Sequence, residues 1–236
     1  MRRAVVNDAA VAAGVLGYSV VLNRVIPARA HIAANLAVSA GAVLAARAAG
    51  ASWSDLGLAP ADVGRGARAG AAAGALVLLG TTALVAAPQT RPRFEAARHV
   101  HEHPNPLFEL ALRIPIGTAL SEELLFRSAA LAAFGRHGSP RRAIALSSVV
   151  FGLWHVLPTF DARRGADPST RLADPATRRE IAATVGLTTL AGVLFGALRR
   201  VSGSVVAPAF AHAAVNGSTF AAARLAGRRL QLAAGR

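Results

Sequence analysis

The chain has 236 residues, of which 53% are hydrophobic and 16% are charged, with a mean hydropathy of +0.43 and a formal net charge of +14. A soluble domain carries about 25% charged residues, so this balance indicates a membrane protein and argues against a soluble nucleic-acid-binding fold. All 26 basic residues are arginine, and the lack of cysteine excludes disulfides, thiolate catalysis and cysteine-rich zinc sites. We predict an all-α, polytopic membrane helix bundle that forms one integral membrane domain over residues 1–236 in the lipid bilayer.

About seven apolar segments approach the length of roughly 20 residues that a membrane-spanning helix needs. Alanine and glycine are frequent within them, and such small residues let membrane helices pack closely. We expect six to eight spans and place seven of them near residues 5–26, 31–50, 67–87, 107–134, 141–158, 180–199 and 203–223.

The first segment allows two interpretations. Two arginines precede its apolar run, and Ala28-Arg29-Ala30 resembles the cleavage site of a secretory signal peptide. Asp8, however, lies at the head of that run and the next apolar segment begins at once, which favours a retained first span. The alanine-rich, lysine-free composition is typical of a bacterial protein, so we expect a multi-pass protein of the bacterial inner membrane. The arginines between spans do not determine its orientation.

Three connections between the predicted spans are polar. Residues 51–66 carry turn signals and two aspartates, which favours a short interfacial segment, while residues 88–106 and 158–179 should lie outside the membrane core. An HExxH-like pattern begins in the second connection, but Asn105 replaces its second histidine and nearby prolines oppose the helix that this zinc motif requires. We interpret the cluster as a solvated loop; its members are His99, His101, Glu102 and His103.

Two adjacent glutamates and an arginine lie inside the apolar segment 107–134. On a helix, Glu123 and Arg127 are four residues apart and share a face, so they can form an ion pair. Glu122 points about 100° away and has no partner on its own helix. A charge at the centre of a membrane helix costs about 2.5–3.5 kcal/mol, so an unpaired carboxylate there indicates a general base. A purely structural ion pair would explain Glu123 and Arg127 but not Glu122.

A histidine lies near the end of the segment 141–158. Phe151 precedes His155 by one helical turn on the same face, and Pro158 should terminate the helix. Alone, this histidine is more typical of a core or interfacial residue than of a site.

A second histidine lies in the segment 203–223. His212 and Asn216 are four residues apart on one face, and Pro208 should kink or start the helix four residues before the histidine. Asn216 alone could serve as a hydrogen bond between helices, whereas the pair favours a site.

Polar groups on membrane helices face the bundle interior, so the polar residues of the segments 107–134, 141–158 and 203–223 should converge on one polar intramembrane cavity. The cavity would hold two carboxylates, one guanidinium, two imidazoles and one amide. Such a set can supply a base, groups that hold water and donors for an oxyanion, which is the equipment of hydrolysis. We take residues 107–223 as the motif-bearing core.

In these residues the chain resembles the CPBP family of intramembrane proteases, which includes the type II CAAX prenyl endopeptidases and the Abi or bacteriocin-processing proteins. The resemblance covers about half of the chain. It implies an endopeptidase that acts near the membrane surface on a membrane-anchored or lipidated protein or peptide. The family's ordered motifs EExxxR, FxxxH and HxxxN read here as Glu122-Glu123-x-x-x-Arg127, Phe151-x-x-x-His155 and His212-x-x-x-Asn216.

The resemblance also implies a role for each polar residue. Glu122 would activate the attacking water with help from His155. Glu123 and Arg127 would shape and neutralise the site. His212 and Asn216 would polarise the scissile carbonyl or hold its oxyanion.

The sequence leaves the need for a metal open. Glu122, His155 and His212 form a possible ligand set for one divalent metal such as zinc, with water in the fourth position. A carboxylate that ligates a metal cannot easily serve as the free base, which favours glutamate-activated water without a metal.

Two other functions use the same polar residues. A non-proteolytic membrane scaffold or bacteriocin self-immunity protein would keep the fold, but it has little reason to bury six polar side chains. An ion- or proton-coupled transporter would use them as a relay, but transporters are typified by internal repeats, which the chain does not show. We therefore expect a peptide or membrane-anchored protein as the partner, and no nucleic acid.

Overall fold

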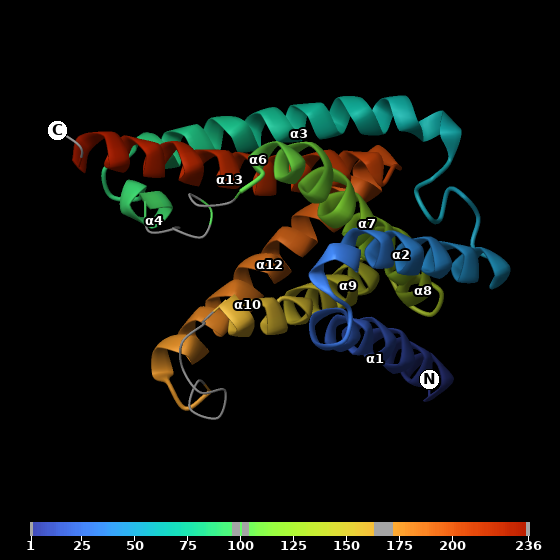
Figure 1. The fold of residues 1–236 in the computed structure, drawn as a ribbon. Helices are drawn as coiled ribbons and strands as arrows, with labels where there is room; N and C mark the ends of the chain where they lie inside the picture. Colours follow the sequence, from blue (N-terminus) through green and yellow to red (C-terminus); the bar gives the residue numbers. More distant parts are fainter. Residues whose placement is uncertain (1, 96–99, 101–103, 163–171, 235–236) are drawn as a thin grey trace.

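The computed structural model describes residues 2–95, 100, 104–162 and 172–234, with side chains from residue 5 to residue 228 within these ranges. Every regular element in them is helical (Figure 1). The long helices are α1 (Arg2–Arg24), α2 (His31–Ala48), α3 (Pro60–Ala86), α9 (Pro140–Trp154), α12 (Pro175–Ser202) and α13 (Val206–Ala234). The short elements are η1 (Ala28–Ala30), α4 (Arg91–Glu95), α6 (Pro106–Phe108), η2 (Glu109–Leu120), α7 (Ser121–Glu123), η3 (Leu124–Ala130), α8 (Leu131–Gly135) and α10 (Val156–Ala162).

Five helical segments are long and apolar enough to cross a membrane: Val5–Arg24, Ala28–Ala48, Pro60–Ala86, Pro140–Ala162 and Pro175–Ser202. They correspond to five of the predicted spans. The other two predicted spans, 107–134 and 203–223, are helical as well, but they carry the glutamates, His212 and Asn216 and are not among the five in the described part of the chain. The protein is therefore an integral membrane helix bundle, as predicted.

Helices α3 and α13 run side by side along one edge of the molecule (Figure 1). On α3, Gly66, Gly70 and Gly74 follow one another at four-residue spacing, and all three are buried. A Cβ on Gly70 would lie 2.9 Å from the carbonyl oxygen and 3.0 Å from the Cα of Ala207, so a larger residue would push α13 away. Small residues at a helix interface permit such close packing in membranes. The glycine stripe thus sets the position of the helix that carries His212.

Helices α9 and α12 also approach each other closely. A Cβ on Gly192 would lie 3.0 Å from the Cα of Ser148, and one on Gly196 would lie 2.9 Å from the Ile144 side chain. This packing brings Phe195 of α12 toward the residues of α9 that line the site.

Helix α1 runs parallel to α9 and α10 and is paired with them near both of its ends. The Asp8 carboxylate lies 2.6 Å from an Arg142 guanidinium nitrogen, and Arg24 lies 2.6 Å from Asp161. Asp8, which stands at the head of an apolar run, is therefore neutralised by a residue of α9. The apolar side of α1 packs into the largest hydrophobic cluster of the bundle.

Two proline positions correct the predicted helix ends. The prediction that Pro158 ends its helix is wrong, because α9 ends at Trp154 with His155 as its C-cap, and α10 then runs through Pro158. Pro158 occupies the first turn of α10, where a backbone N–H has no partner within the helix, so proline fits there. Helix α3 starts at Pro60 and not near residue 67, because proline is compatible with the first helical position. Pro208 lies in the first turn of α13, so the helix starts there.

The polar connections are described in part. Residues 51–59 form turns between α2 and α3, α4 lies within 88–106, and α10 extends into 158–179. The cluster of His99, His101, Glu102 and His103 lies outside the described residues.

The segment from Pro106 to Gly135 is a continuous helical run with wide turns. In η2 the backbone N–H of Ser121 donates to the Ile116 carbonyl, five residues back, and Leu131 does the same to Phe126 at the end of η3. Pro115 inside η2 has no N–H to donate, which disturbs the ordinary four-residue pattern. Wide turns of this kind are frequent at functional sites. Here they flank α7, which carries the two glutamates.

Candidate active site

The two glutamates of α7 are held in place by the neighbouring helices. The Ser39 hydroxyl of α2 donates to the Ser121 carbonyl at 2.7 Å, and the Ser147 hydroxyl of α9 donates to the Phe126 carbonyl at 2.9 Å. Both bonds are buried, and they reach backbone carbonyls on either side of the glutamates, one directly before Glu122 and one three residues after Glu123. Sequence reasoning missed these two serines, because a serine in an apolar helix gives no signal of the helix it will contact.

The predicted ion pair between Glu123 and Arg127 is present. The Arg127 Nε lies 3.3 Å from Glu123 Oε2, and the two side chains are 1% and 0% exposed. The guanidinium carbon lies 4.1 Å from the ring centre of Phe151 and 5.3 Å from that of Phe195. Neither terminal nitrogen of Arg127 has a hydrogen-bond partner among the described residues. Aromatic faces therefore surround the cation and exclude water from it.

Glu123 also contacts the third motif. Its Oε1 lies 2.9 Å from Nδ1 of His212 on α13. The His212 ring stacks on Phe195 at 5.1 Å between ring centres and meets the edge of Phe151 at 5.8 Å. A carboxylate on one ring nitrogen and an aromatic ring on the face fix the orientation of the imidazole.

Glu122 lies on the other side of the same imidazole. Its Oε2 is 3.9 Å from His212 Nε2, which is too far for a hydrogen bond. This oxygen is buried and has no hydrogen-bond partner in the part of the chain that the structure describes. A separation above 3.5 Å between two polar groups is compatible with one water that contacts both. The carboxylate that has no partner on its own helix thus faces an oriented imidazole.

His155 joins the site through Phe151. Its Nδ1 lies 2.8 Å from the Phe151 carbonyl oxygen, and its ring meets the Phe151 ring edge-on at 4.8 Å. If Nδ1 carries the proton and donates it to this carbonyl, Nε2 is left as an acceptor. No hydrogen bond joins His155 to either glutamate among the described residues. The second motif therefore meets the first and third through the aromatic ring that precedes it by one turn.

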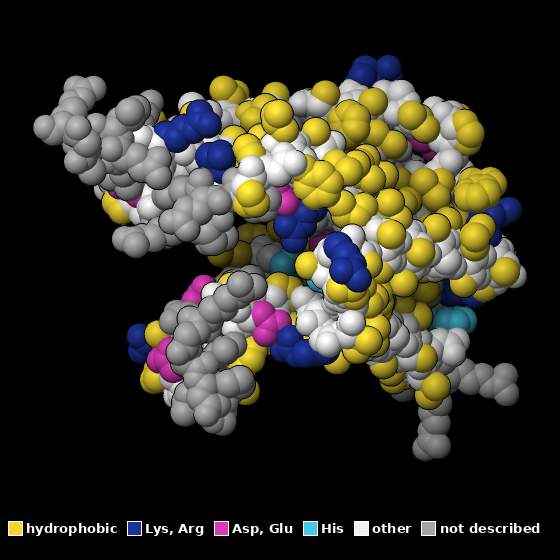
Figure 2. Space-filling model, in the orientation of Figure 1, with side chains coloured by type: hydrophobic (Ala, Val, Ile, Leu, Met, Phe, Trp, Pro, Cys, Tyr) yellow, Lys and Arg dark blue, Asp and Glu magenta, His cyan; other side chains and the backbone are white. Residues whose placement is uncertain are grey.

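Asn216 lies one turn beyond His212 and does not contact the carboxylates. It lines a cavity of about 780 Å³ between α4, η2 and α13, together with Glu109 and Arg113. Figure 2 shows that this face of the molecule is hollowed and that histidine side chains lie at the inner end of the hollow. The structure thus brings five of the six predicted residues around one aromatic core and puts Asn216 in the wall of a neighbouring cavity.

The candidate metal ligands do not fit a metal ion as they stand. In the described ranges, no group of three or more histidine, aspartate or glutamate side chains could hold one. Glu122 and His212 face each other, and the bond from His155 Nδ1 to a backbone carbonyl leaves its Nε2 free, but the three side chains are not gathered closely enough to hold one ion. The chemistry of the site is therefore derived from the protein's own groups.

Residues 104–218 match the family model of the type II CAAX prenyl endopeptidase Rce1-like proteins. This segment is an Rce1-like domain. All six predicted site residues lie within it, and the resemblance to the CPBP proteases is confirmed. The chain matches no curated protein and no solved structure, so the assignment depends on this domain. The Rce1-like family is a family of proteases, which supports peptidase activity in general for this membrane protein.

Proposed function

We propose that this protein is an intramembrane endopeptidase that hydrolyses a peptide bond with water activated by Glu122. One observation carries the proposal: a buried, unpartnered carboxylate oxygen of Glu122 faces an imidazole that a second carboxylate, Glu123, holds in place. A purely structural ion pair needs only Glu123 and Arg127. The free oxygen of Glu122 and the oriented His212 are what a general base and its water require.

The reaction begins with a water between Glu122 and His212. Glu122 accepts a proton from this water while the water oxygen bonds to the scissile carbonyl carbon. The bond between that carbon and the amide nitrogen then breaks, and Glu122 returns the proton to the departing amine. The water oxygen remains in the new carboxyl group. His155, with its free ring nitrogen, is the second acceptor that holds the water.

Arg127 and the aromatic rings set the electrostatics of this step. The guanidinium offsets one of the two adjacent carboxylates, and burial among Phe151 and Phe195 keeps bulk water from screening the pair. Preorganised charges in a water-poor site stabilise a transition state more strongly than the same charges in water.

The substrate is a membrane-associated or lipidated protein or peptide. The cavity beside Asn216 adjoins the helix that carries His212, and its size of about 780 Å³ admits a peptide segment. From this wall the Asn216 amide can donate to the scissile carbonyl once a peptide is bound. The role of Asn216 in this proposal therefore begins only when the substrate is bound.

The test is cleavage of lipidated and unlipidated peptide libraries by detergent-purified protein. Replacing Glu122 with Gln keeps the shape of the side chain and removes the base, so we expect a rate loss of about 10²- to 10⁴-fold. The exposed Glu180 provides a control, because Glu180→Gln makes the same chemical change outside the site. An arm with a chelator, followed by added zinc, tests the metal alternative.

Two outcomes would overturn the proposal. Cleavage by Glu122→Gln at the wild-type rate would remove Glu122 from the chemistry. Failure of folded wild-type protein to cleave any peptide would favour the scaffold or self-immunity function. The thermal unfolding of each variant shows whether it is folded.

A further inference from the structure

Two cavities adjoin at the end of the bundle where α1 begins and α2 ends. Their volumes are about 500 Å³ and about 510 Å³. They share four lining residues, Ala49, Ala51, Ala132 and Arg136, so Arg136 stands at the boundary between them. One cavity is polar and the other is apolar, as their lining side chains show.

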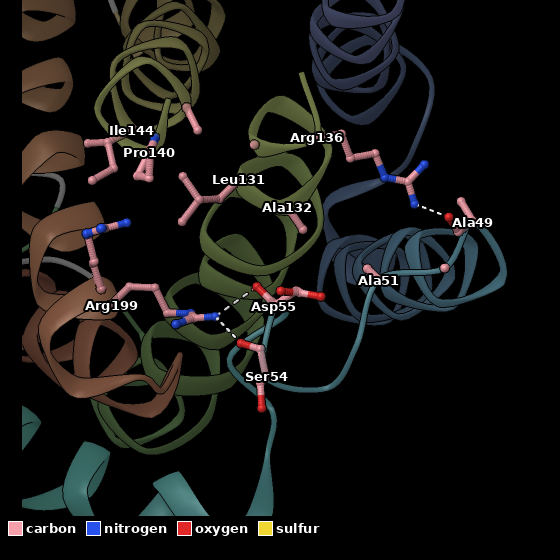
Figure 3. Close-up of a pocket in the computed structure, with 14 residues that line it drawn as sticks. Ala49, Ala51, Ser54, Asp55, Leu131, Ala132, Arg136, Pro140, Ile144 and Arg199 are labelled. Carbon is pink, nitrogen blue, oxygen red and sulfur yellow. Dashed lines mark hydrogen bonds between the residues drawn. The ribbon is translucent and has the colours of Figure 1, made fainter. Parts of the chain in front are cut away.

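The polar cavity is lined by three arginines and one aspartate (Figure 3). Arg199 is 6% exposed and donates to the carbonyl oxygens of Ser54 and Asp55 at 3.0 and 2.9 Å. Arg136 donates to the Ala49 carbonyl, and Arg200 is exposed. Neither Arg136 nor Arg200 forms an ion pair with a described carboxylate. Two guanidinium groups are therefore left with uncompensated charge.

Among the residues that the structure describes, Asp55 is the single carboxylate in the lining of this cavity. It accepts hydrogen bonds from the Ser52 hydroxyl and backbone N–H at 2.7 and 2.8 Å. These bonds, and secondarily the charge of Arg199, hold the pKa of Asp55 below its ordinary value. The Asp55 carboxylate is thus ionised and already hydrogen-bonded to Ser52 of its own loop. With three arginines and one aspartate in its lining, the cavity keeps a net positive charge.

The apolar cavity is a slot between α1 and α2 with η3 and α8 as its floor. Alanines line much of both walls and the floor, and their small side chains leave the space open. Val11, Val15 and Leu125 complete the lining toward the bundle centre. A slot of this kind accepts a flexible hydrocarbon chain, because it offers contact surface and few polar groups.

Trp53 indicates how deeply the end of the bundle that holds the two cavities lies in the membrane. Trp53, in the turn after α2, is 46% exposed, and the Arg47 guanidinium lies 4.7 Å from its ring centre. Tryptophan and arginine gather at the level of lipid headgroups, where anionic lipids attract the basic side chains. The polar cavity therefore lies at headgroup level, and the slot extends along α1 and α2 toward the membrane core.

We propose that the two cavities together bind one anionic phospholipid, whose headgroup occupies the polar cavity lined by Arg136 and Arg200 and one of whose acyl chains occupies the slot. Arg136 lines both cavities, as the glycerol region of such a lipid requires. The polar cavity is remote from His155, because α9 runs from Pro140 at this cavity to Trp154 beside His155, a length of about 20 Å at 1.5 Å per residue. The slot reaches Leu125, two residues beyond Glu123. The lipid fills the space between α1 and α2 and joins them to α8.

The test is native mass spectrometry of delipidated protein titrated with dioleoyl phosphatidylglycerol or with dioleoyl phosphatidylcholine. The two lipids have the same chains, so a difference in retention reports the headgroup. One arginine near an anionic lipid changes affinity about fivefold, so wild type should retain phosphatidylglycerol at about 25-fold lower concentration through two arginines. The double variant Arg136→Gln/Arg200→Gln should lose this preference.

Two further variants separate headgroup from chain. Ala46→Phe fills the slot and leaves the arginines in place, so it should weaken the retention of both lipids by about tenfold or more. The control Arg29→Gln/Arg179→Gln removes the same charge from exposed positions in η1 and near the start of α12, away from both cavities, and it should keep the wild-type preference. Thermal unfolding checks that each variant is folded.

Three results would overturn the proposal. The first is equal retention of both lipids by wild type, which would make the slot a site for any chain. The second is an unchanged preference in the arginine double variant. The third is competition by glycerol phosphate at the same concentration as the lipid, which would make the polar cavity a site for free anions.

Discussion

The Glu123 carboxylate of α7 lies 2.9 Å from Nδ1 of His212 on α13, and this contact joins two elements that are 89 residues apart in sequence. The same carboxylate is paired with Arg127 on its own helical run. Glu123 is therefore used twice, once to neutralise a buried guanidinium and once to orient an imidazole. The second use decides which ring nitrogen of His212 faces Glu122.

We expect Glu123→Gln to reduce the rate of peptide cleavage by about 10²- to 10⁴-fold, although the variant keeps the shape of the side chain. An amide in this position no longer selects one tautomer of the imidazole, and the corresponding change in serine protease triads has an effect of this size. The measurement is kcat together with the dependence of the cleavage rate on pH. A purely structural role of Glu123 would leave this pH dependence unchanged. A rate within about threefold of wild type would show that His212 does not need this partner.

The ion pair between Glu123 and Arg127 gives a prediction about stability. Arg127→Met removes the guanidinium and leaves a carboxylate that is 0% exposed without its cation, which should lower the free energy of unfolding by about 3–5 kcal/mol. The double variant Arg127→Met/Glu123→Leu replaces both charges by apolar groups and should recover most of this loss without activity. Unfolding in mixed micelles measures both variants. Equal stability of the single and double variants would contradict this explanation.

Several features of the site followed from residue spacing and the membrane environment. Glu123 and Arg127 pair because positions four apart on a helix share a face, and Glu122 is free because it does not. The three motifs meet around Phe151 because polar groups in lipid must turn inward. Each of these inferences needs only helix geometry and the cost of burying charge.

Contacts between helices could not be predicted in this way. Which helix turn faces which depends on close packing, so neither the bond from Glu123 to His212 nor the stacking of Phe195 has a signal in the sequence. Asn216 shares a face with His212, yet one turn along α13 is enough to place it in another cavity. Helix ends near prolines were ambiguous for a related reason. A proline can follow the end of one helix or lie in the first turn of the next, and Pro158 lies in the first turn of α10.

The glycine stripe on α3 gives a prediction with a control on the same helix. Gly70→Val should push α13 away because its Cβ would lie 2.9 Å from the Ala207 carbonyl oxygen, whereas Gly80→Val meets nothing within 4 Å. Overpacking costs about 1–3 kcal/mol, so we expect a lower unfolding temperature for Gly70→Val and little change for Gly80→Val. Peptide cleavage should fall with Gly70→Val, since α13 carries His212. Similar unfolding temperatures for the two variants would show that the α3–α13 interface tolerates the larger residue.

The two ion pairs of α1 differ in burial, and the difference predicts unequal effects on stability. Asp8 is 9% exposed opposite Arg142, while Asp161 and Arg24 are 37% and 42% exposed. Asp8→Ala leaves a partly buried arginine without its partner and should lower the free energy of unfolding by about 1–3 kcal/mol. Asp161→Ala breaks a solvated pair, for which about 0–1 kcal/mol is usual. Raising the salt concentration should therefore narrow the gap between wild type and Asp161→Ala, because salt screens exposed charges more than buried ones. A larger loss from Asp161→Ala than from Asp8→Ala would mean that the α10 end, and not the α9 end, holds α1 in the bundle.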